Sequence, residues 1–127
     1  MKLSTFVVLV IVAGLFFIQG SPVEQVTPQQ AGFYPVAVKA VIDKKCYGCH
    51  SEKGKSQDAK DALMWDSLPG LTKIKIVAKM EDIIEVLEKN AMPPEEVVKK
   101  YPEMRLLTAE NELLRSWAEV KADSLLK

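Results

Sequence analysis

The 127-residue sequence is poor in the residues that usually build metal or thiol sites, with two cysteines and one histidine. A single histidine excludes any site built on two imidazoles, and two cysteines exclude a four-cysteine zinc site. Neither sign of charge is in excess, since 17 Lys and Arg residues balance 17 Asp and Glu residues. The chain therefore lacks the basic surplus typical of nucleic-acid-binding proteins, and we expect no nucleic-acid partner.

The sequence also lacks an uncharged apolar run of the ~20 residues that a membrane-spanning helix needs. The apolar run at residues 6–18 follows Lys2 and precedes Gly20 and Ser21. A positive start, a short apolar stretch and small residues are typical of an export signal. We expect residues 1–20 to be a signal peptide, or an uncleaved anchor to the inner membrane, because no A-x-A pattern marks a cleavage site. The protein is then periplasmic or otherwise exported, and it contacts a membrane only if this segment is uncleaved.

The scarce residues lie together, as Cys46-Tyr47-Gly48-Cys49-His50. C-x-x-C-H is the attachment motif of a c-type haem. In a helical turn, two thiols three residues apart lie on one face, where they can bond the two vinyl groups on one edge of a porphyrin. The histidine can then supply the proximal ligand to the iron. The motif predicts one covalent haem c, held by Cys46 and Cys49 as thioethers and by His50 as proximal iron ligand.

Three other interpretations of the motif remain. A thiol–disulfide couple is expected in a βαβ context, and no strand-like segment precedes this motif. A structural zinc site needs four protein ligands, and the chain has no third cysteine or second histidine to complete one. Copper(I) could bind two thiolates and a methionine, because soft ligands select that ion. The histidine after the second cysteine favours haem over all three.

The second axial ligand of such an iron cannot be histidine, which leaves methionine, lysine, tyrosine, water or no ligand. Three internal methionines are expected to pack within a helix or to lie on a charged surface, and not to bind iron: Met64, Met80 and Met104. Met92 differs, because it precedes Pro93 and Pro94, which disfavour helical geometry and restrict the loop. Met92 is therefore the candidate distal iron ligand, with a simple helix stop as the alternative.

Apolar periodicity predicts helices along most of the chain after a proline- and glutamine-rich linker at residues 21–33. We expect a helix from Pro35 that ends at the motif, a short helix over 58–67, a long helix within 71–90, one or two turns over 95–100, and a final helix capped by Thr108. Within 71–90, the buried stripe is expected to be Ile76, Met80, Ile83, Ile84 and Leu87. Asn90 should close that helix in the left-handed conformation. In the final helix, the expected buried stripe is Leu113, Leu114, Trp117 and Val120.

Several segments together resemble the small secreted bacterial haem-binding domain family: residues 36–51, Met92-Pro93, and residues 106–117. The resemblance covers about residues 34–120. It implies an all-α, cytochrome c-like bundle of four to five helices around one covalently attached haem, in a domain over residues 34–127. It also implies haem attachment at Cys46 and Cys49, proximal His50 and distal Met92. The family often has an aromatic-rich segment soon after the motif, whereas residues 51–64 carry no aromatic residue, and Trp65 is the candidate substitute.

Histidine and methionine ligation is typical of one-electron carriers. We therefore expect an exported monohaem cytochrome that is a monomer, works with a redox partner protein and is not an enzyme. The alternative is a haem-based sensor, or a binder of gas or peroxide at an open sixth position. Lysines around the motif could steer an acidic partner, although acidic residues interleave with them: Lys39, Lys44, Lys45, Lys53, Lys55 and Lys60.

Overall fold

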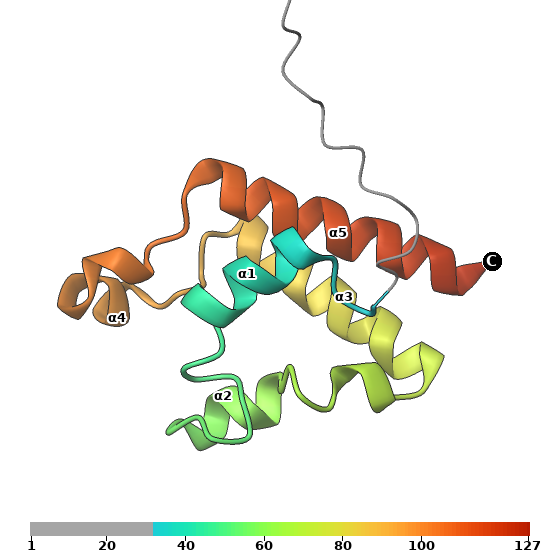
Figure 1. Cartoon of the computed structure of the whole chain (residues 1–127), viewed down its shortest axis with the longest axis horizontal. Coiled ribbons are helices and arrows are strands. Elements are labelled where there is room, and N and C mark those ends of the chain that lie inside the picture. Colours follow the sequence, from blue (N-terminus) through green and yellow to red (C-terminus); the bar gives the residue numbers. More distant parts are fainter. Residues whose placement is uncertain (1–31) are drawn as a thin grey trace, which may run out of the picture.

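A computed structural model describes residues 32–127, and this part of the chain consists of helices and connecting turns, without strands. The predicted signal peptide or anchor, and the predicted linker as far as residue 31, lie outside the described residues. The elements follow in this order: α1 (Val36–Lys45), α2 (Gln57–Ala62), η2 (Leu68–Gly70), α3 (Lys73–Glu88), α4 (Glu95–Lys100), η3 (Pro102–Met104) and α5 (Thr108–Leu126) (Figure 1). The all-α class predicted from the sequence is confirmed.

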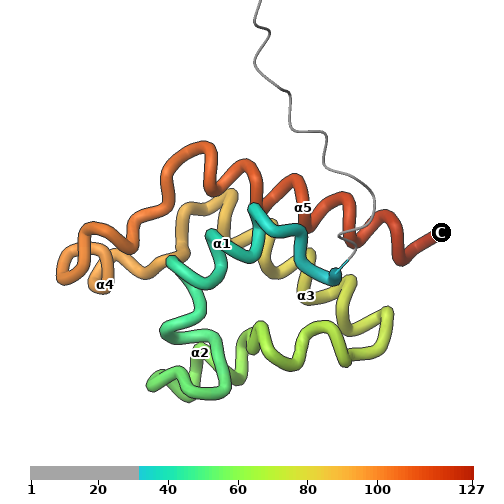
Figure 2. Tube along the Cα trace, viewed as in Figure 1, coloured from blue at the N-terminus to red at the C-terminus, as the bar shows by residue number. Residues whose placement is uncertain are grey.

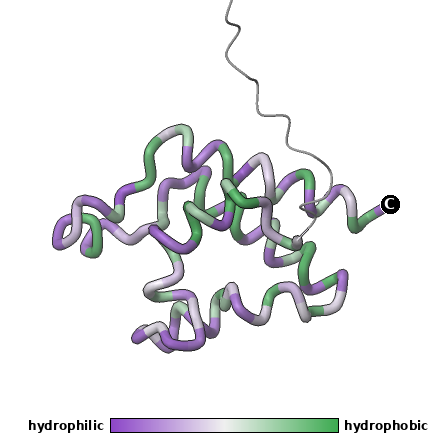
Figure 3. Tube along the Cα trace, in the orientation of Figure 1, coloured by the Kyte–Doolittle hydropathy of each residue, from purple (hydrophilic) through white to green (hydrophobic). Residues whose placement is uncertain are grey.

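The core of the molecule forms where the two long helices, α3 and α5, pack against each other. Helix α1 also contacts α5, while α2 and η2 form a lower layer on the side away from α5 (Figures 1 and 2). Apolar residues recur along α1, α3 and α5 instead of forming one run, as expected when a helix turns one side inward (Figure 3). The result is one continuous apolar cluster that draws on α1, α3, α5 and the segment around η2.

The stripe predicted for the long central helix is confirmed on α3. Its inward residues have exposed fractions of 6% or less: Ile76, Met80, Ile83 and Leu87. Ile84 is partly buried against the same cluster. Met80 is completely buried, at 0% exposed, which agrees with its expected role in packing. Asn90 follows the helix with φ of 49°, so its predicted left-handed conformation is also confirmed.

The prediction for α5 is right at two of its four positions: Leu114 and Trp117 are buried, but Leu113 and Val120 are 37% and 66% exposed. The inward face instead continues through Ala118 and Ala122, four and eight residues after Leu114. Small side chains at these positions allow α5 to approach its neighbours closely. Periodicity alone favoured the larger apolar residues, and this part of the prediction was wrong.

The start of α5 also differs from the prediction. Thr108 is the first helical residue, and Leu107 is the N-cap. The backbone N–H of this N-cap residue has a partner within the helix, because the Glu110 carboxylate accepts it at 2.8 Å. Glu110 therefore serves the first turn both through this bond and through its charge, which favours a helix N-terminus.

The short helix α2 is a further difference, because it ends at Ala62 and not at residue 67. Its start is capped by Ser56, whose Oγ accepts the backbone N–H of Ala59 at 3.2 Å. Trp65 therefore lies in the turns that follow α2, where it is 5% exposed. This placement brings Trp65 next to the C-x-x-C-H motif.

Candidate functional site

The motif forms a single turn that directly continues α1, as predicted. The carbonyl oxygen of Cys46 accepts the backbone N–H of Cys49 at 3.2 Å and that of His50 at 3.0 Å. The carbonyl of Ile42, one turn earlier in α1, accepts the N–H groups of Cys46 and Tyr47, both at 2.9 Å. Both cysteines are free thiols of intermediate burial. We refer to residues 46–50 as the motif turn.

The His50 side chain is held by two backbone carbonyls. Its Nδ1 lies 2.8 Å from the carbonyl oxygen of Ala59 and 2.9 Å from that of Leu63. A carbonyl oxygen can only accept, so Nδ1 carries the hydrogen, and in the neutral ring Nε2 keeps the free lone pair. Metal-binding histidines are oriented in this way by their second nitrogen. His50 thus has a defined tautomer, in which the lone pair of Nε2 is available to bind a metal.

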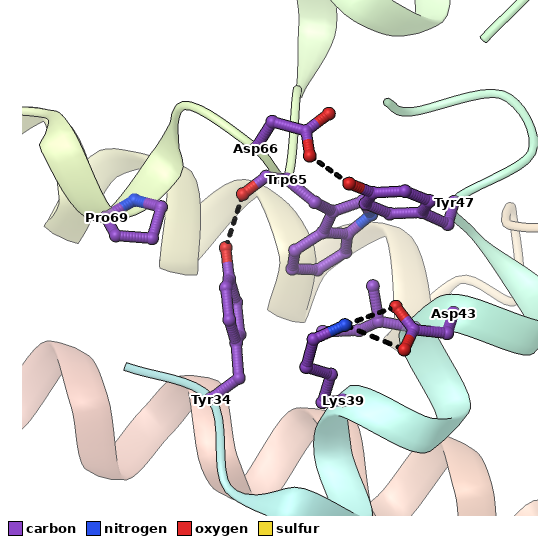
Figure 4. A pocket seen from close by; sticks show the side chains of 8 residues that line it. Tyr34, Lys39, Asp43, Tyr47, Trp65, Asp66 and Pro69 are labelled. Carbon is purple, nitrogen blue, oxygen red and sulfur yellow. Dashed lines mark hydrogen bonds and ion pairs between the residues drawn. The ribbon is translucent and has the colours of Figure 1, made fainter. Parts of the chain in front are cut away.

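The segment after α2 fastens the motif turn at further points. The backbone N–H of Trp65 donates to the carbonyl of His50 at 2.9 Å. Asp66 accepts the backbone N–H of Glu52 at 2.6 Å and the hydroxyl of Tyr47 (Figure 4). The hydrogen bond from Tyr47, followed by that from Glu52, lowers the pKa of Asp66, and the same Tyr47–Asp66 bond raises the pKa of Tyr47. Residues 59–66 therefore form a cradle around the motif turn.

Gly54 permits the chain to fold back closely against the motif turn. A Cβ atom at this position would lie 2.2 Å from the carbonyl oxygen of Cys49 and 3.0 Å from that of Ser51. The backbone N–H of Gly54 donates to the same Ser51 carbonyl at 2.9 Å. A close approach between backbone atoms leaves no pattern in the sequence, so the role of Gly54 emerges only from the structure.

Cys46 sits in surroundings that favour the neutral thiol. Burial is the main cause that raises the pKa of Cys46 to about 12, and the charges of Glu110 and Cys49 add to it. The thiolate is the form that attacks disulfides and binds soft metals, so a catalytic cysteine normally has a lowered pKa. This environment argues against the thiol–disulfide interpretation. Within residues 32–127, no group of three or more His, Cys, Asp or Glu residues is placed to hold a metal ion.

Met92 lies in the connection between α3 and α4, with 36% of its surface exposed. In Figure 1, this connection and α4 lie at the end of the molecule where α1 stops. Within residues 32–127, no hydrogen bond and neither of the cavities described below joins Met92 to the motif turn. The structure thus brings Cys46, Cys49 and His50 together, and ligation by Met92 stays a prediction.

Two cavities accompany the site. The larger, of about 220 Å³, borders the motif turn through Tyr47 and is also lined by Tyr34, Lys39, Ile42, Asp43, Trp65, Asp66 and Pro69 (Figure 4). The smaller, of about 180 Å³, lies between residues 32–35 and α5. Ligand pockets usually measure roughly 300–1,000 Å³, and neither cavity is lined by Cys46, Cys49, His50 or Met92. The candidate site is therefore defined by the side chains of the motif and not by either of these two cavities.

An aromatic cluster that the sequence analysis missed lies beside the motif turn. Tyr34 donates its hydroxyl hydrogen to the carbonyl of Trp65 at 2.7 Å, and its ring lies 5.7 Å from that of Trp117. Phe33, the last residue of the predicted linker, joins the cluster 6.2 Å from Trp117. The indole N–H groups of Trp65 and Trp117 are buried and have no partner within the described residues. Buried N–H groups in proteins normally have a hydrogen-bond acceptor, so each of these two indoles could donate to a further polar group.

The lysines near the motif are not a uniform steering surface. Lys39 pairs with Asp43 at 2.7 Å on the surface of α1. Lys45 is buried, with 5% of its side chain exposed, so it cannot attract a partner from solution. The interleaved acidic residues weaken such a patch, as the sequence indicated, and the burial of Lys45 weakens it further.

The comparisons with known proteins neither support nor refute the family resemblance. No protein-family model, no curated protein and no solved structure matches the chain. None of the helices within residues 32–127 has the length and apolar character needed to cross a bilayer. The family named above therefore stands as a resemblance carried by the residues quoted for it.

Proposed function

We propose that this protein is an exported monohaem c-type cytochrome that transfers one electron at a time. The observation that carries the proposal is the side chain of His50, held by the carbonyls of Ala59 and Leu63 within one turn of two free thiols. One turn of chain thus offers two sulfurs and one oriented nitrogen. Covalent attachment of a c-type haem requires this set of donors.

Each donor has a role in this proposal. Cys46 and Cys49 would form the two thioether bonds, His50 would be the proximal ligand, and Met92 would be the distal ligand. When bound, the haem supplies an iron that accepts and releases one electron. The chain holds the imidazole in one tautomer, fixes the motif turn through residues 59–66, and shields it with buried Trp65. These constraints limit movement of the ligands when the charge of the site changes.

We also infer a cytochrome c-like arrangement of the helices. Its support is the all-α architecture, with the motif at the end of the first helix and Met92 in the connection before α4, as the family resemblance implies. The exported location follows from the predicted signal peptide or anchor at residues 1–20. A monomer that exchanges electrons with a redox partner protein completes the proposal.

A haem-based sensor, or a protein that binds gas or peroxide at an open sixth position, is the second candidate. The observation that favours it is the 36% exposure of Met92, which would be compatible with an iron that lacks a methionine ligand. Peroxide chemistry is the weaker form of this candidate, because the only histidine would be occupied as the proximal ligand and no second one could act as a general acid or base.

Absorption spectra of protein made in a host that attaches haem would separate these functions. Electron transfer predicts a low-spin spectrum in both oxidation states, a far-red sulfur-to-iron band in the ferric protein, and slow carbon monoxide binding by the ferrous protein. A high-spin spectrum with rapid and tight carbon monoxide binding would favour the sensor. A colourless protein from the same host would refute both functions.

A further inference from the structure

Lys45 is a buried lysine that immediately precedes the first cysteine of the motif. Its Nζ donates to the carbonyl oxygens of Glu103 at 2.5 Å and Arg105 at 2.8 Å, and it lies 3.7 Å from Oε2 of Glu110. Two of the three N–H donors of the ammonium group are thus hydrogen-bonded, and the Glu110 carboxylate adds an ion pair. Buried charges persist when they are paired in this manner. Lys45 therefore joins the end of α1 to a segment about 60 residues further along the chain.

The partners of Lys45 belong to the connecting segment, residues 89–107, which carries Met92 together with α4 and η3. This segment is anchored at its start by the backbone N–H of Ala91, which donates to the carbonyl of Val86 at 2.8 Å. Among the described residues, Lys45 makes the only hydrogen bonds between residues 92–106 and the rest of the protein.

Apolar packing adds little to the attachment of this segment. Helix α4 packs mainly against η3, within the segment itself. Its buried residue, Val98, lies outside the main apolar cluster, and only Leu106, near the end of the segment, packs against that cluster. The charged hydrogen bonds of Lys45 are thus the principal link between the middle of the connecting segment and the body of the protein.

We propose that Lys45 is a positioning residue that holds the connecting segment, and with it Met92, beside the motif turn. The inference rests on the proposed function in one respect, that Met92 is the distal ligand. Lys45 is covalently joined to Cys46, so one residue couples the position of the haem-attachment turn to the segment that carries the opposite ligand. Glu110 extends the coupling to α5, because its carboxylate also accepts the backbone N–H of Leu107.

Hydrogen exchange of the haem-loaded protein tests the attachment directly. Lys45→Met keeps most of the side-chain length but removes the donors and the charge, and Lys44→Met is the matched control because Lys44 is the exposed neighbour on α1. We expect amides in α4 and η3 to exchange about tenfold faster or more in Lys45→Met, because charged hydrogen bonds are lost. Amides of α3 should keep their protection, and Lys44→Met should match the wild type.

Unchanged exchange in α4 and η3, or an equal increase in every helix, would overturn the inference. The second result would show that Lys45 supports only global stability. Should Lys45→Met fail to fold, Glu110→Gln takes its place, since glutamine can still accept from Leu107 but no longer carries the charge that faces Lys45. The same selective increase is then expected, with a smaller size.

Carbon monoxide binding by the ferrous protein tests the positioning of Met92. We expect Lys45→Met to bind faster than the wild type and to approach the rate of Met92→Ala, while Lys44→Met is unchanged. Faster exchange without faster binding would overturn the positioning role. If the wild type already binds as fast as Met92→Ala, the proposed ligation by Met92 fails, while the exchange measurement still decides whether Lys45 holds the segment.

Discussion

The motif turn and the connecting segment would face the same iron from opposite sides, yet they are held to the fold in different ways. The motif turn is tied to residues 59–66 through the His50 side chain, the carboxylate of Asp66 and backbone groups. The middle of the connecting segment, by contrast, shares hydrogen bonds with the rest of the described protein only through Lys45. One side is fixed by many short bonds, and the other by a single buried cation.

This contrast separates two requirements of a covalent haem protein. Haem attachment would need Cys46, Cys49 and His50 in a fixed relation, and the hydrogen bonds around His50 would maintain it. The opposite ligand needs only one sulfur within reach, and a segment with few bonds to the core can supply it and can also release it. Locally weak elements are where proteins usually permit such movement. The contrast predicts that changes on the two sides will have different consequences.

The largest effect is expected for the double variant Cys46→Ala/Cys49→Ala. Both covalent bonds disappear, and a haem held only by His50 would be lost on denaturation. We also expect the purified variant to be less helical and less cooperative in unfolding than the wild type, because a bound haem stabilises the native state by mass action. Haem staining after denaturing electrophoresis, together with circular dichroism, measures both. Retained staining would contradict covalent attachment through these cysteines.

Met92→Ala tests the opposite side. The covalent haem should be retained, because the motif turn is unaffected, but the far-red band of the ferric protein should vanish. The matched control is Met104→Ala, since Met104 lies in the same connecting segment and is partly buried in η3. Absorption spectra of both variants decide the matter. A band that survives in Met92→Ala but disappears in Met104→Ala would show that Met104, and not Met92, binds the iron.

A third prediction concerns the reactivity of the buried Cys46 thiol in the haem-free chain. A pKa of about 12, compared with the usual 9.0, lowers the thiolate fraction of Cys46 at pH 8 by about 10³. Alkylation of Cys46 should therefore be far slower in the folded chain than after denaturation, as measured by mass spectrometry of the labelled peptides.

The same shift fixes the sign of a pH effect. The folded chain keeps the Cys46 proton where the unfolded chain has lost it, so this contribution to stability is complete below about pH 9 and is lost as pH rises towards about 12. In Cys46→Ala this part of the alkaline loss should be absent. Equal alkylation rates before and after denaturation would contradict the buried environment.

A smaller effect is expected for Gly54→Ala, which tests how tightly the chain packs against the motif turn. The added Cβ would meet the backbone of Cys49, and relief of that overlap should cost about 1–3 kcal/mol of unfolding free energy. Gly70→Ala is the control, because nothing lies within 4 Å of a Cβ there. Its change should stay within about 0.5 kcal/mol in the same denaturant titration. Equal losses of unfolding free energy in Gly54→Ala and Gly70→Ala would contradict the close packing at Gly54.

The smallest effect is expected for Asp66→Asn, on the rim of the cradle. The lowered pKa of Asp66 means that its contribution to stability is present above the usual carboxyl range and is lost as pH falls through it. The variant should therefore lose less stability on acidification than the wild type. Asp123→Asn, in the exposed part of α5, is the control and should follow the wild type. Denaturant titrations at several acidic pH values provide the comparison.

Much of the fold was predictable, because apolar spacing in a helix reports the inward face directly. The stripe on α3 and the delivery of the motif by α1 follow from local patterns of this kind. The inward face of α5 did not, since Ala118 and Ala122 are buried there, while Leu113 and Val120, the larger residues that the prediction favoured, are exposed. Phe33 likewise packs onto the helices although its sequence neighbours indicate a linker.

In the candidate site, too, some features were predictable from the sequence and others were not. Cys46, Cys49 and His50 form a motif whose spacing is itself the signal. The partners that hold it are backbone carbonyls, at Ala59 and Leu63 for His50, and any residue type supplies a carbonyl. For the same reason the sequence analysis grouped Lys45 with lysines that could steer a partner, although Lys45 is buried and donates to carbonyls 58 and 60 residues away.

The intact mass of the exported protein, purified from a host that attaches haem and measured after denaturation, tests the central claim most directly. We predict a mass equal to the processed chain plus one haem, with the added mass confined to the peptide that contains the motif turn. A mass equal to that of the bare chain, in material from a host shown to load another c-type cytochrome, would contradict the account.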